Sequence, residues 1–250
     1  MSSQGPAPPK NWPPGVRYLT TPVYSPTLTP SHLTALRTRP PQDAKEAAAA
    51  AAAPANPHPK GPCKLVRIAP VTTPSHPAHG QSGLFAARDL PPGTFLLAYL
   101  GEIHATPPPA GGDERGEAAD PHADSDYDLS LDREMGIGID AARSGTEARF
   151  INDYRGVADR PNAEFREVWD AGRGERGMGV WVLPEGKSGK GKGKGKGKSK
   201  GNGKGIRKGE EILVSYGRGF WGARREREEV TRILCSAAEI GSPLLRVATV

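Results

Sequence analysis

Two short segments of the sequence carry side chains that could bind and orient a reactant. The first is Arg149-Phe150-Ile151-Asn152, and the second, residues 209–216, ends in Tyr216. An amide, a guanidinium group and a tyrosine hydroxyl can position a reactant and stabilise charge without a metal or a covalent intermediate. Chemistry of this kind requires no catalytic triad, and no Cys-His or Ser-His-Asp arrangement stands out in the sequence.

The sequence contains no convincing motif for a metal site or a nucleotide-binding loop. The only cysteines are Cys63 and Cys235, so the chain by itself cannot build a four-cysteine zinc site or a disulfide framework. His76 and His79 lie among prolines, where no helix can bring both rings to one face, and we interpret them as residues of a solvated loop. The Gly-Lys-Ser sequences at 186–188 and 197–199 lack the upstream glycine of a phosphate-binding loop. We therefore predict no metal site.

Further motifs lie before and between the two segments. They are Gly-Leu-Phe-Ala at 83–86, Pro-Pro-Gly at 91–93, Tyr-Leu-Gly-Glu at 99–102, Ile-Asp-Ala at 139–141 and Pro-Asn at 161–162. Each alone is an ordinary strand or turn. Their joint order and spacing, over almost all of the region that can pack, resemble the SET domain. Members of that family transfer a methyl group from S-adenosylmethionine to lysine side chains of proteins.

The resemblance implies a cofactor site made largely of backbone. In SET domains the Gly-Leu-Phe segment touches the amino-acid moiety of S-adenosylmethionine, and the residue after the asparagine reaches the adenine. Asn152 could instead cap a turn. Trp221 and Phe220 either pack in the first turn of the predicted helix or close over the cofactor. The residues implied to bind the cofactor are Ser82, Gly83, Leu84, Arg149, Phe150, Asn152, Asp153 and Trp221.

For the lysine channel the resemblance implies two catalytic residues, Tyr216 and Tyr127, although each could instead be a structural aromatic residue. A lysine amine is almost wholly protonated at neutral pH. A narrow aromatic channel would desolvate the ammonium and lower its pKa, and a neighbouring sulfonium would lower it further by like-charge repulsion. In the family, the segment that bears the tyrosine is also threaded through the loop that follows the asparagine, which is a rare topology.

On the cofactor side the sequence departs from the usual SET pattern. Asp153 stands where most members have histidine. Eight residues separate Asn152 from Pro161, which is more than in the common pattern. The loop that usually holds two glycines reads Gln81-Ser82-Gly83. The cysteine-rich segments that flank many members are also missing. The alternative to an enzyme is therefore a SET-like protein-interaction module without catalysis.

The remaining segments predict a mostly β domain. Short runs of branched and aromatic residues stand between glycine and proline residues, which indicates strands. No helical pattern separates them, which argues against βαβ units and a Rossmann-type methyltransferase. A helix is predicted from about residue 221 to residue 239, where Gly241-Ser242-Pro243 ends it. The predicted strands are residues 65–68, 83–87, 94–100, 127–131, 136–139, 162–168, 178–183 and 211–215.

Composition separates this domain from its flanking segments. Residues 1–62 hold 14 of the 26 prolines and an alanine run, which predicts a largely disordered arm. Its apolar residues between 12 and 24 could still form an extended strap on the domain surface. The SET domain is predicted over residues 63–222, with an acidic insertion at 104–126 and a low-complexity Lys/Gly insertion at 187–205. Residues 223–250 complete the helix and form a tail.

Charge and hydropathy indicate the partners. The Lys/Gly insertion carries eight lysines, and removing them from the formal net charge of +6 leaves −2. It could contact nucleic acid weakly and without sequence preference, dock on the acidic insertion as a target of self-methylation, or have no function. No apolar run is long enough for a signal peptide or a membrane span. We therefore expect a monomer, nuclear or cytoplasmic and not secreted, with no membrane partner and a lysine-containing protein or peptide, such as a histone, as substrate.

Overall fold

A computed structural model describes residues 6–39, 57, 60–106, 120–183, 205–217 and 220–222. The chain divides into two units, Met1–Val214 and Ser215–Val250, which we describe separately. The division falls inside the predicted domain of residues 63–222, whose boundaries remain a prediction. Most of the acidic insertion, all of the Lys/Gly insertion except Gly205, and the helix predicted beyond residue 222 lie outside the described residues.

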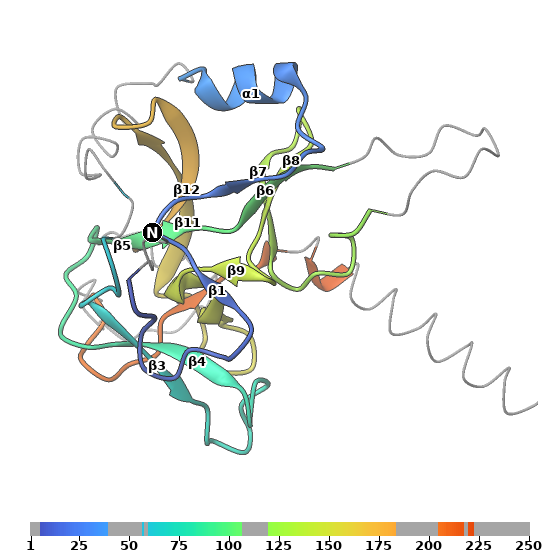
Figure 1. Cartoon of the computed structure of the whole chain (residues 1–250). Coiled ribbons are helices and arrows are strands. Elements are labelled where there is room, and N and C mark those ends of the chain that lie inside the picture. Colours follow the sequence, from blue (N-terminus) through green and yellow to red (C-terminus); the bar gives the residue numbers. More distant parts are fainter. Residues whose placement is uncertain are drawn as a thin grey trace, which may run out of the picture. The chain divides into compact units, whose positions relative to one another are not determined.

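The first unit is mostly β, as predicted, and its strands are short (Figure 1). They form a three-stranded sheet of order β11-β12-β5, a four-stranded sheet of order β2-β6-β8-β7, and three two-stranded pairs. The elements are β1 (Arg17–Tyr18), β2 (Val23–Tyr24), α1 (Pro30–Arg37), β3 (Val66–Pro70), β4 (Ser82–Ala86), β5 (Phe95–Tyr99), β6 (Glu102–Ala105), β7 (Asp128–Asp132), β8 (Ile137–Asp140), β9 (Ser144–Gly145), the 3-10 helix η1 (Glu147–Phe150), β10 (Asn152–Asp153), β11 (Ala163–Asp170), β12 (Glu175–Val182) and β13 (Leu213–Val214).

Each of the eight predicted strands overlaps an observed one. The longest, β11 and β12, pair as an antiparallel hairpin, and β12 also pairs with β5. The strand β6 was not predicted, because His104 interrupts its apolar pattern although that side chain is completely buried. Two-residue strands such as β9 and β10 show no alternation in sequence and exist only through their partners.

The segment that leads to β13 lies between two distant parts of the chain. On one side, the Ile212 N–H donates to the Leu84 carbonyl of β4 at 2.8 Å. On the other side, β13 runs parallel to β10, and the Asn162 N–H donates to the Leu213 carbonyl at 3.0 Å. Both ends of the loop from residue 152 to residue 162 therefore bond to the same short strand. This arrangement agrees with the threaded topology expected from the SET resemblance.

The prediction of disorder for residues 1–62 is wrong for residues 6–39. These residues form the strap that the sequence suggested, with β1 parallel to β9 and β2 parallel to β6, followed by α1 (Figure 1). Pro30 begins the helix, and the Thr29 side chain accepts from the His32 N–H in a capping box. Proline-rich composition misled the prediction, because extended backbone that lacks a repeating apolar pattern can still pair with a sheet.

Two buried carboxylates anchor this strap. Glu147 of η1 accepts from the Tyr18 hydroxyl at 3.2 Å and from the Cys63 N–H at 2.7 Å. Glu175 of β12 accepts from the Tyr24 hydroxyl and from Arg37. Burial and the carboxylate of Glu147 raise the pKa of Tyr18, so this hydroxyl stays a donor at every physiological pH. The strap is thus bonded into the domain at each of its strands.

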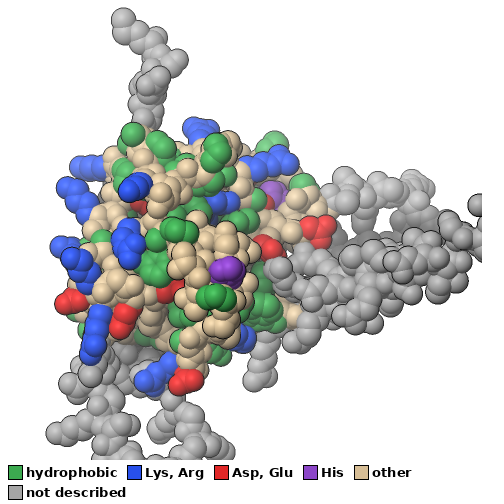
Figure 2. Space-filling model, turned by 90° about the horizontal axis from the view of Figure 1, so that it is seen from below, with side chains coloured by type: hydrophobic (Ala, Val, Ile, Leu, Met, Phe, Trp, Pro, Cys, Tyr) green, Lys and Arg blue, Asp and Glu red, His purple; other side chains and the backbone are tan. Residues whose placement is uncertain are grey.

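The surface of the described residues is polar and carries both signs of charge. Figure 2 shows basic side chains gathered along one side of the face in view, with a few acidic ones among them. Among the described residues, none of the helices is both long and apolar enough to cross a membrane.

Candidate active site

Three segments that carry separate sequence motifs meet at Gly83, Asn152 and Glu211. Asn152 Nδ2 donates to Glu211 Oε1 at 2.8 Å. A Cβ atom on Gly83 would lie 2.7 Å from Glu211 Oε1 and 3.2 Å from Asn152 Nδ2, so only glycine leaves room for this contact. The strand β4, the start of β10 and the approach to β13 thus converge at one point.

His76 completes this group, although the sequence indicated a solvated loop. The residue is only 8% exposed, and its Nε2 lies 3.0 Å from Glu211 Oε2. Its Nδ1 accepts from the Ala78 N–H at 3.0 Å, so the ring proton lies on Nε2 and points at the carboxylate. The interpretation of His76 as solvated is therefore wrong. Proline-rich surroundings concealed its burial, because its partner Glu211 lies 135 residues away in sequence.

The orientation of Asn152 follows from this contact. A carboxylate only accepts hydrogen bonds, so the amide nitrogen must face Glu211, which leaves Asn152 Oδ1 as an acceptor for another group. Glu211 and Asn152 Oδ1 together offer acceptors and negative charge beside the backbone of Ser82 and Gly83. This set of acceptors suits the ammonium group of an amino acid, and so it fits the amino-acid moiety of S-adenosylmethionine.

The backbone of β4 is partly occupied by the protein itself. The Leu84 carbonyl accepts from Ile212, and the Ala86 N–H donates to the Glu210 carbonyl. Ser82 and Gly83 lie at the start of the strand, opposite Pro70 and Ala69 of β3. Of the three predicted backbone contacts to a cofactor, those of Ser82 and Gly83 therefore fit the structure better than that of the Leu84 carbonyl.

Arg149 links the two predicted ends of the site. Its guanidinium group lies over the ring of Tyr127, with Cζ 4.3 Å from the ring centroid, and 5.1 Å from the centroid of Phe150. Arg149 also donates to the carbonyls of Ala141 and Ala142. A cation over an aromatic face is attracted by the ring electrons. Arg149, which is half-buried, thus lies between the residue predicted for the lysine channel and one predicted for the cofactor.

Phe150 also meets the N-terminal strap. The ring of Trp12 packs edge-on against Phe150 at 5.6 Å and against Tyr18 at 5.1 Å, measured between centroids. The Trp12 indole N–H donates to the Val16 carbonyl at 2.7 Å, which fixes the ring. The strap therefore supports the 149–152 segment directly, a role that the sequence did not indicate.

Tyr127 is held by its backbone while its side chain is 37% exposed. Its carbonyl accepts from the Tyr99 hydroxyl at 2.6 Å and from the Ala141 N–H at 3.1 Å. Its N–H donates to the Ser125 hydroxyl at 3.2 Å. An exposed tyrosine ring on a fixed backbone is available to a ligand.

Asp153 is turned toward the protein. The residue is 7% exposed, and its carboxylate accepts from the Arg155 side chain at 2.8 Å and from the Arg155 N–H at 2.8 Å. The adjoining Tyr154 N–H donates to the Val214 carbonyl at 3.0 Å. Because the side chain forms this local turn, any contact of residue 153 with an adenine must come from its backbone, as the resemblance implies.

Tyr216 and Trp221 belong to the second unit. Within it, the ring of Tyr216 packs edge-on against Phe220 at 4.8 Å, and Phe220 packs against Trp221 at 5.4 Å. The Gly217 N–H donates to the Ser215 hydroxyl at 3.3 Å. The three aromatic residues thus form a compact cluster, and the roles predicted for Tyr216 and Trp221 remain predictions.

One cavity of the first unit lies apart from these residues. It is lined by apolar side chains of β5, β6, β8 and β12, with Asp170, Glu175 and Arg176 among them. None of the predicted site residues lines it. No group of three or more histidine, cysteine, aspartate or glutamate side chains suited to a metal occurs within the described ranges.

Comparison with known proteins gives matches only among solved structures, since no family model and no curated protein matches the chain. The Chaetomium thermophilum Polycomb Repressive Complex 2, autoinhibited and bound to S-adenosylmethionine, is similar at 24% identity and a TM-score of 0.41, over 68% of this chain and 17% of that chain. A crystal structure of the same complex is similar at 25% identity and a TM-score of 0.40, over 63% of this chain and 16% of that chain. The apo complex with mutations in Ezh2 gives 21% and 0.41, over 66% and 16%. The chain thus spans less than a fifth of each of these proteins.

Proposed function

We propose that residues 63–222 form a SET-type protein lysine methyltransferase, which moves a methyl group from S-adenosylmethionine to a lysine side chain of a protein substrate. The observation that carries the proposal is the convergence of Gly83, Asn152 and Glu211. These residues come from three motifs far apart in sequence whose order alone suggested the family. An unrelated β protein would have no reason to bring the three motifs to one point.

At the cofactor end, the chain's own residues would bind S-adenosylmethionine and orient it. S-adenosylmethionine, when bound, supplies an electrophilic methyl group on a positively charged sulfur. Asn152 Oδ1 and the carboxylate of Glu211 would attract its ammonium group, and the backbone of Ser82 and Gly83 would fix its direction. Fixed acceptors of this kind need no reorganisation when the ligand arrives, which is how a site without a metal can position a reactant.

At the lysine end, Tyr127 would present its exposed ring to the substrate, and the resemblance implies Tyr216 as the second tyrosine of the channel. The Arg149 guanidinium group behind the Tyr127 ring places a fixed positive charge close to an incoming ammonium. Like charge disfavours the protonated form, so Arg149 would lower the pKa of the substrate lysine and increase the neutral fraction that can attack a methyl group. No base within the protein is then required, because the proton can leave to water before transfer.

One observation favours a second function, a SET-like interaction module without catalysis. The Leu84 carbonyl already accepts from the Ile212 N–H, so one of the predicted backbone contacts to the cofactor has a partner within the protein. A protein that keeps the fold but not the cofactor would show such internal contacts. Calorimetry with S-adenosylmethionine separates the two functions, since a module without cofactor gives no heat and no thermal shift at millimolar concentration.

The enzyme is tested with labelled methyl transfer to lysine peptides, histones among them, using the full chain. We expect label on lysine, with loss of the signal in Asn152→Ala and Tyr216→Phe. Glu134→Gln is the control, because that carboxylate is exposed in the turn between β7 and β8 and should leave transfer unchanged. Unchanged transfer in both site variants would rule out the assignment. Location in the nucleus or cytoplasm, the monomeric state and the identity of the substrate remain predictions.

A further inference from the structure

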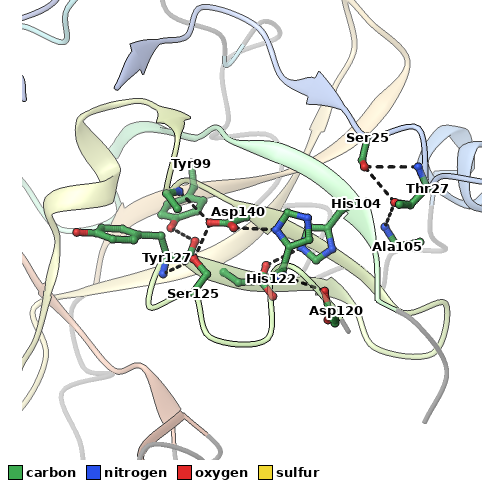
Figure 3. Close-up of polar contacts among 12 residues, drawn as sticks. Ser25, Thr27, Tyr99, His104, Ala105, Asp120, His122, Ser125, Tyr127 and Asp140 are labelled. Atoms are coloured by element: carbon green, nitrogen blue, oxygen red, sulfur yellow. Dashed lines mark hydrogen bonds and ion pairs between the residues drawn. The ribbon is translucent and has the colours of Figure 1, made fainter. Parts of the chain in front are cut away.

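Two histidines and two aspartates form a cluster across the strand β8. His104 of β6 and His122 stack face to face, with ring centroids 3.6 Å apart and planes at 18° (Figure 3). His104 Nε2 lies 2.9 Å from Asp128 Oδ1, and His122 Nδ1 lies 2.8 Å from Asp140 Oδ2. In sequence His104 is the first residue of the acidic insertion and His122 is near its end, so the stack joins the two ends of that insertion.

The bond between His104 and Asp128 passes directly over a glycine. The strand β8 lies between β6 and β7, and a Cβ atom on Gly138 would lie 2.6 Å from His104 Nε2 and 2.8 Å from Asp128 Oδ1. His104 is completely buried. Burial disfavours its charged form, but the hydrogen bond and charge of Asp128 outweigh burial, and the pKa of His104 is raised.

Asp140 connects this stack to Tyr127. Its Oδ2 holds His122, while its Oδ1 accepts from the Ser125 hydroxyl at 2.8 Å and from the Ala142 N–H at 2.8 Å (Figure 3). Ser125 in turn accepts from the Tyr127 N–H at 3.2 Å. A buried carboxylate that accepts several bonds holds its partners in one geometry, because breaking any bond leaves a charge poorly compensated.

The Asp140 carboxylate is also linked to Arg149 through the backbone of the next two residues. Ala142, whose N–H it holds, and Ala141 provide the carbonyls that accept from the Arg149 guanidinium group. The two groups that meet in the Tyr127 and Arg149 contact are therefore both tied to residues next to Asp140. A shift of the 120–127 segment would move the tyrosine ring off the guanidinium group.

We propose that the cluster of His104, His122 and Asp140 is a positioning device that holds Tyr127 against Arg149 at the lysine end of the proposed site. The effect of this cluster on lysine binding rests on the proposed function, whereas its role in holding Tyr127 against Arg149 does not. These residues touch no reacting atom. They act through Ser125 and the backbone of residues 127 and 142, and so set the shape of the wall that an incoming lysine meets.

Three carboxylates from different segments surround the stack. Asp128 faces His104 from β7, Asp140 faces His122 from β8, and Asp120 accepts from the His122 N–H within the same segment. Thr27 of the strap, which accepts from the Ala105 N–H, adds a polar but uncharged neighbour. Each histidine thus has one carboxylate against its ring.

The test uses Asp140→Asn in the full chain, with Glu134→Gln on the same hairpin as the matched control. The amide retains the shape but loses the charge and one acceptor oxygen, so it can no longer accept from His122, Ser125 and Ala142 together. We expect amide hydrogen exchange at residues 122–127 and 142 to become about tenfold faster. We also expect kcat/KM for a lysine peptide to fall about tenfold, with the Kd of S-adenosylmethionine changed less than about twofold.

Two further variants separate positioning from folding. His122→Phe keeps a stacked ring but removes the bond to Asp140, and Ser125→Ala removes only the link to Tyr127. Both should raise the peptide KM while the Kd of S-adenosylmethionine stays within about twofold of the wild-type value. Unchanged exchange in Asp140→Asn would overturn the device itself, whether or not the protein transfers methyl groups. Faster exchange with unchanged peptide kinetics would overturn its role for lysine. Absence of transfer by the wild type would contradict the proposed function and leave the exchange result to decide the structural role.

Discussion

Glu211 Oε1 accepts a hydrogen bond from Asn152 Nδ2 at 2.8 Å, and the two residues are 59 positions apart in sequence. Through its other oxygen the same carboxylate meets His76 at 3.0 Å. One buried glutamate therefore ties the loop before β4, the segment after η1 and the approach to β13 to one another. Because the amide of Asn152 is fixed by this bond, Glu211 decides which of its atoms a ligand meets.

Replacement of this carboxylate is expected to weaken cofactor binding. Glu211→Gln allows the amide of Asn152 to turn over, and His76 loses a charged acceptor. We expect the Kd of S-adenosylmethionine to rise about tenfold, the usual scale for a lost bond to a charged group. Calorimetry measures it, and Glu210→Gln is the matched control because that neighbour is exposed. Equal affinities in the two variants would contradict a role for Glu211.

A methyl group at Gly83 is expected to disrupt the same contact. In Gly83→Ala the added carbon would lie 2.7 Å from Glu211 Oε1, closer than real Cβ atoms approach, and 3.1 Å from the Phe85 ring, which is tighter than most real contacts. Overpacking of this kind costs about 1–3 kcal/mol in the free energy of unfolding. Urea denaturation measures it. Gly177→Ala in β12 is the control, since its Cβ would meet only Val168 at 3.9 Å. A loss no greater than that of the control would show that the segment adjusts.

The raised pKa of His104 predicts how stability depends on pH. A group whose pKa is higher in the folded protein contributes stability below its unfolded pKa, and this contribution is lost as the pH rises through the folded value. The free energy of unfolding of the wild type should therefore fall, relative to that of His104→Asn, as the pH rises above about 6.5. Denaturation at a series of pH values tests it. His79→Asn, which alters an exposed histidine, is the matched control.

Loss of a tyrosine hydroxyl should loosen the N-terminal strap. Tyr18→Phe leaves Glu147, which is 2% exposed, with fewer donors, and Tyr24→Phe does the same for Glu175. We expect each change to lower the free energy of unfolding by about 1–3 kcal/mol. Tyr154→Phe is the control, since that ring contacts Arg155 by its face. If limited proteolysis cuts no faster between residues 6 and 39 in the variants, the anchoring role is wrong.

Several parts of the fold could be predicted because short patterns are enough for them. Alternating or continuous apolar runs predicted β5, β11 and β12, and the order of motifs predicted that the segments of Asn152 and Glu211 would meet. The strands β1, β2 and β9 could not be predicted with the same method, because two residues carry no period and their pairing depends on partners far along the chain. His104 and His76 were hidden for a related reason, since their burial comes from neighbours distant in sequence.

The sequence by itself determined the mostly β character, the places of the main strands and the motifs that suggest methyl transfer, since these depend on local apolar patterns and turn residues. Only the tertiary structure decided that residues 6–39 of the arm pack, that Glu211 bonds to both Asn152 and His76, and that Asp140 bonds to His122 and Ser125 beside two stacked histidines. The physical reason is that a buried polar side chain is stable only with a partner. Neither the partner nor the burial is visible until the chain has folded.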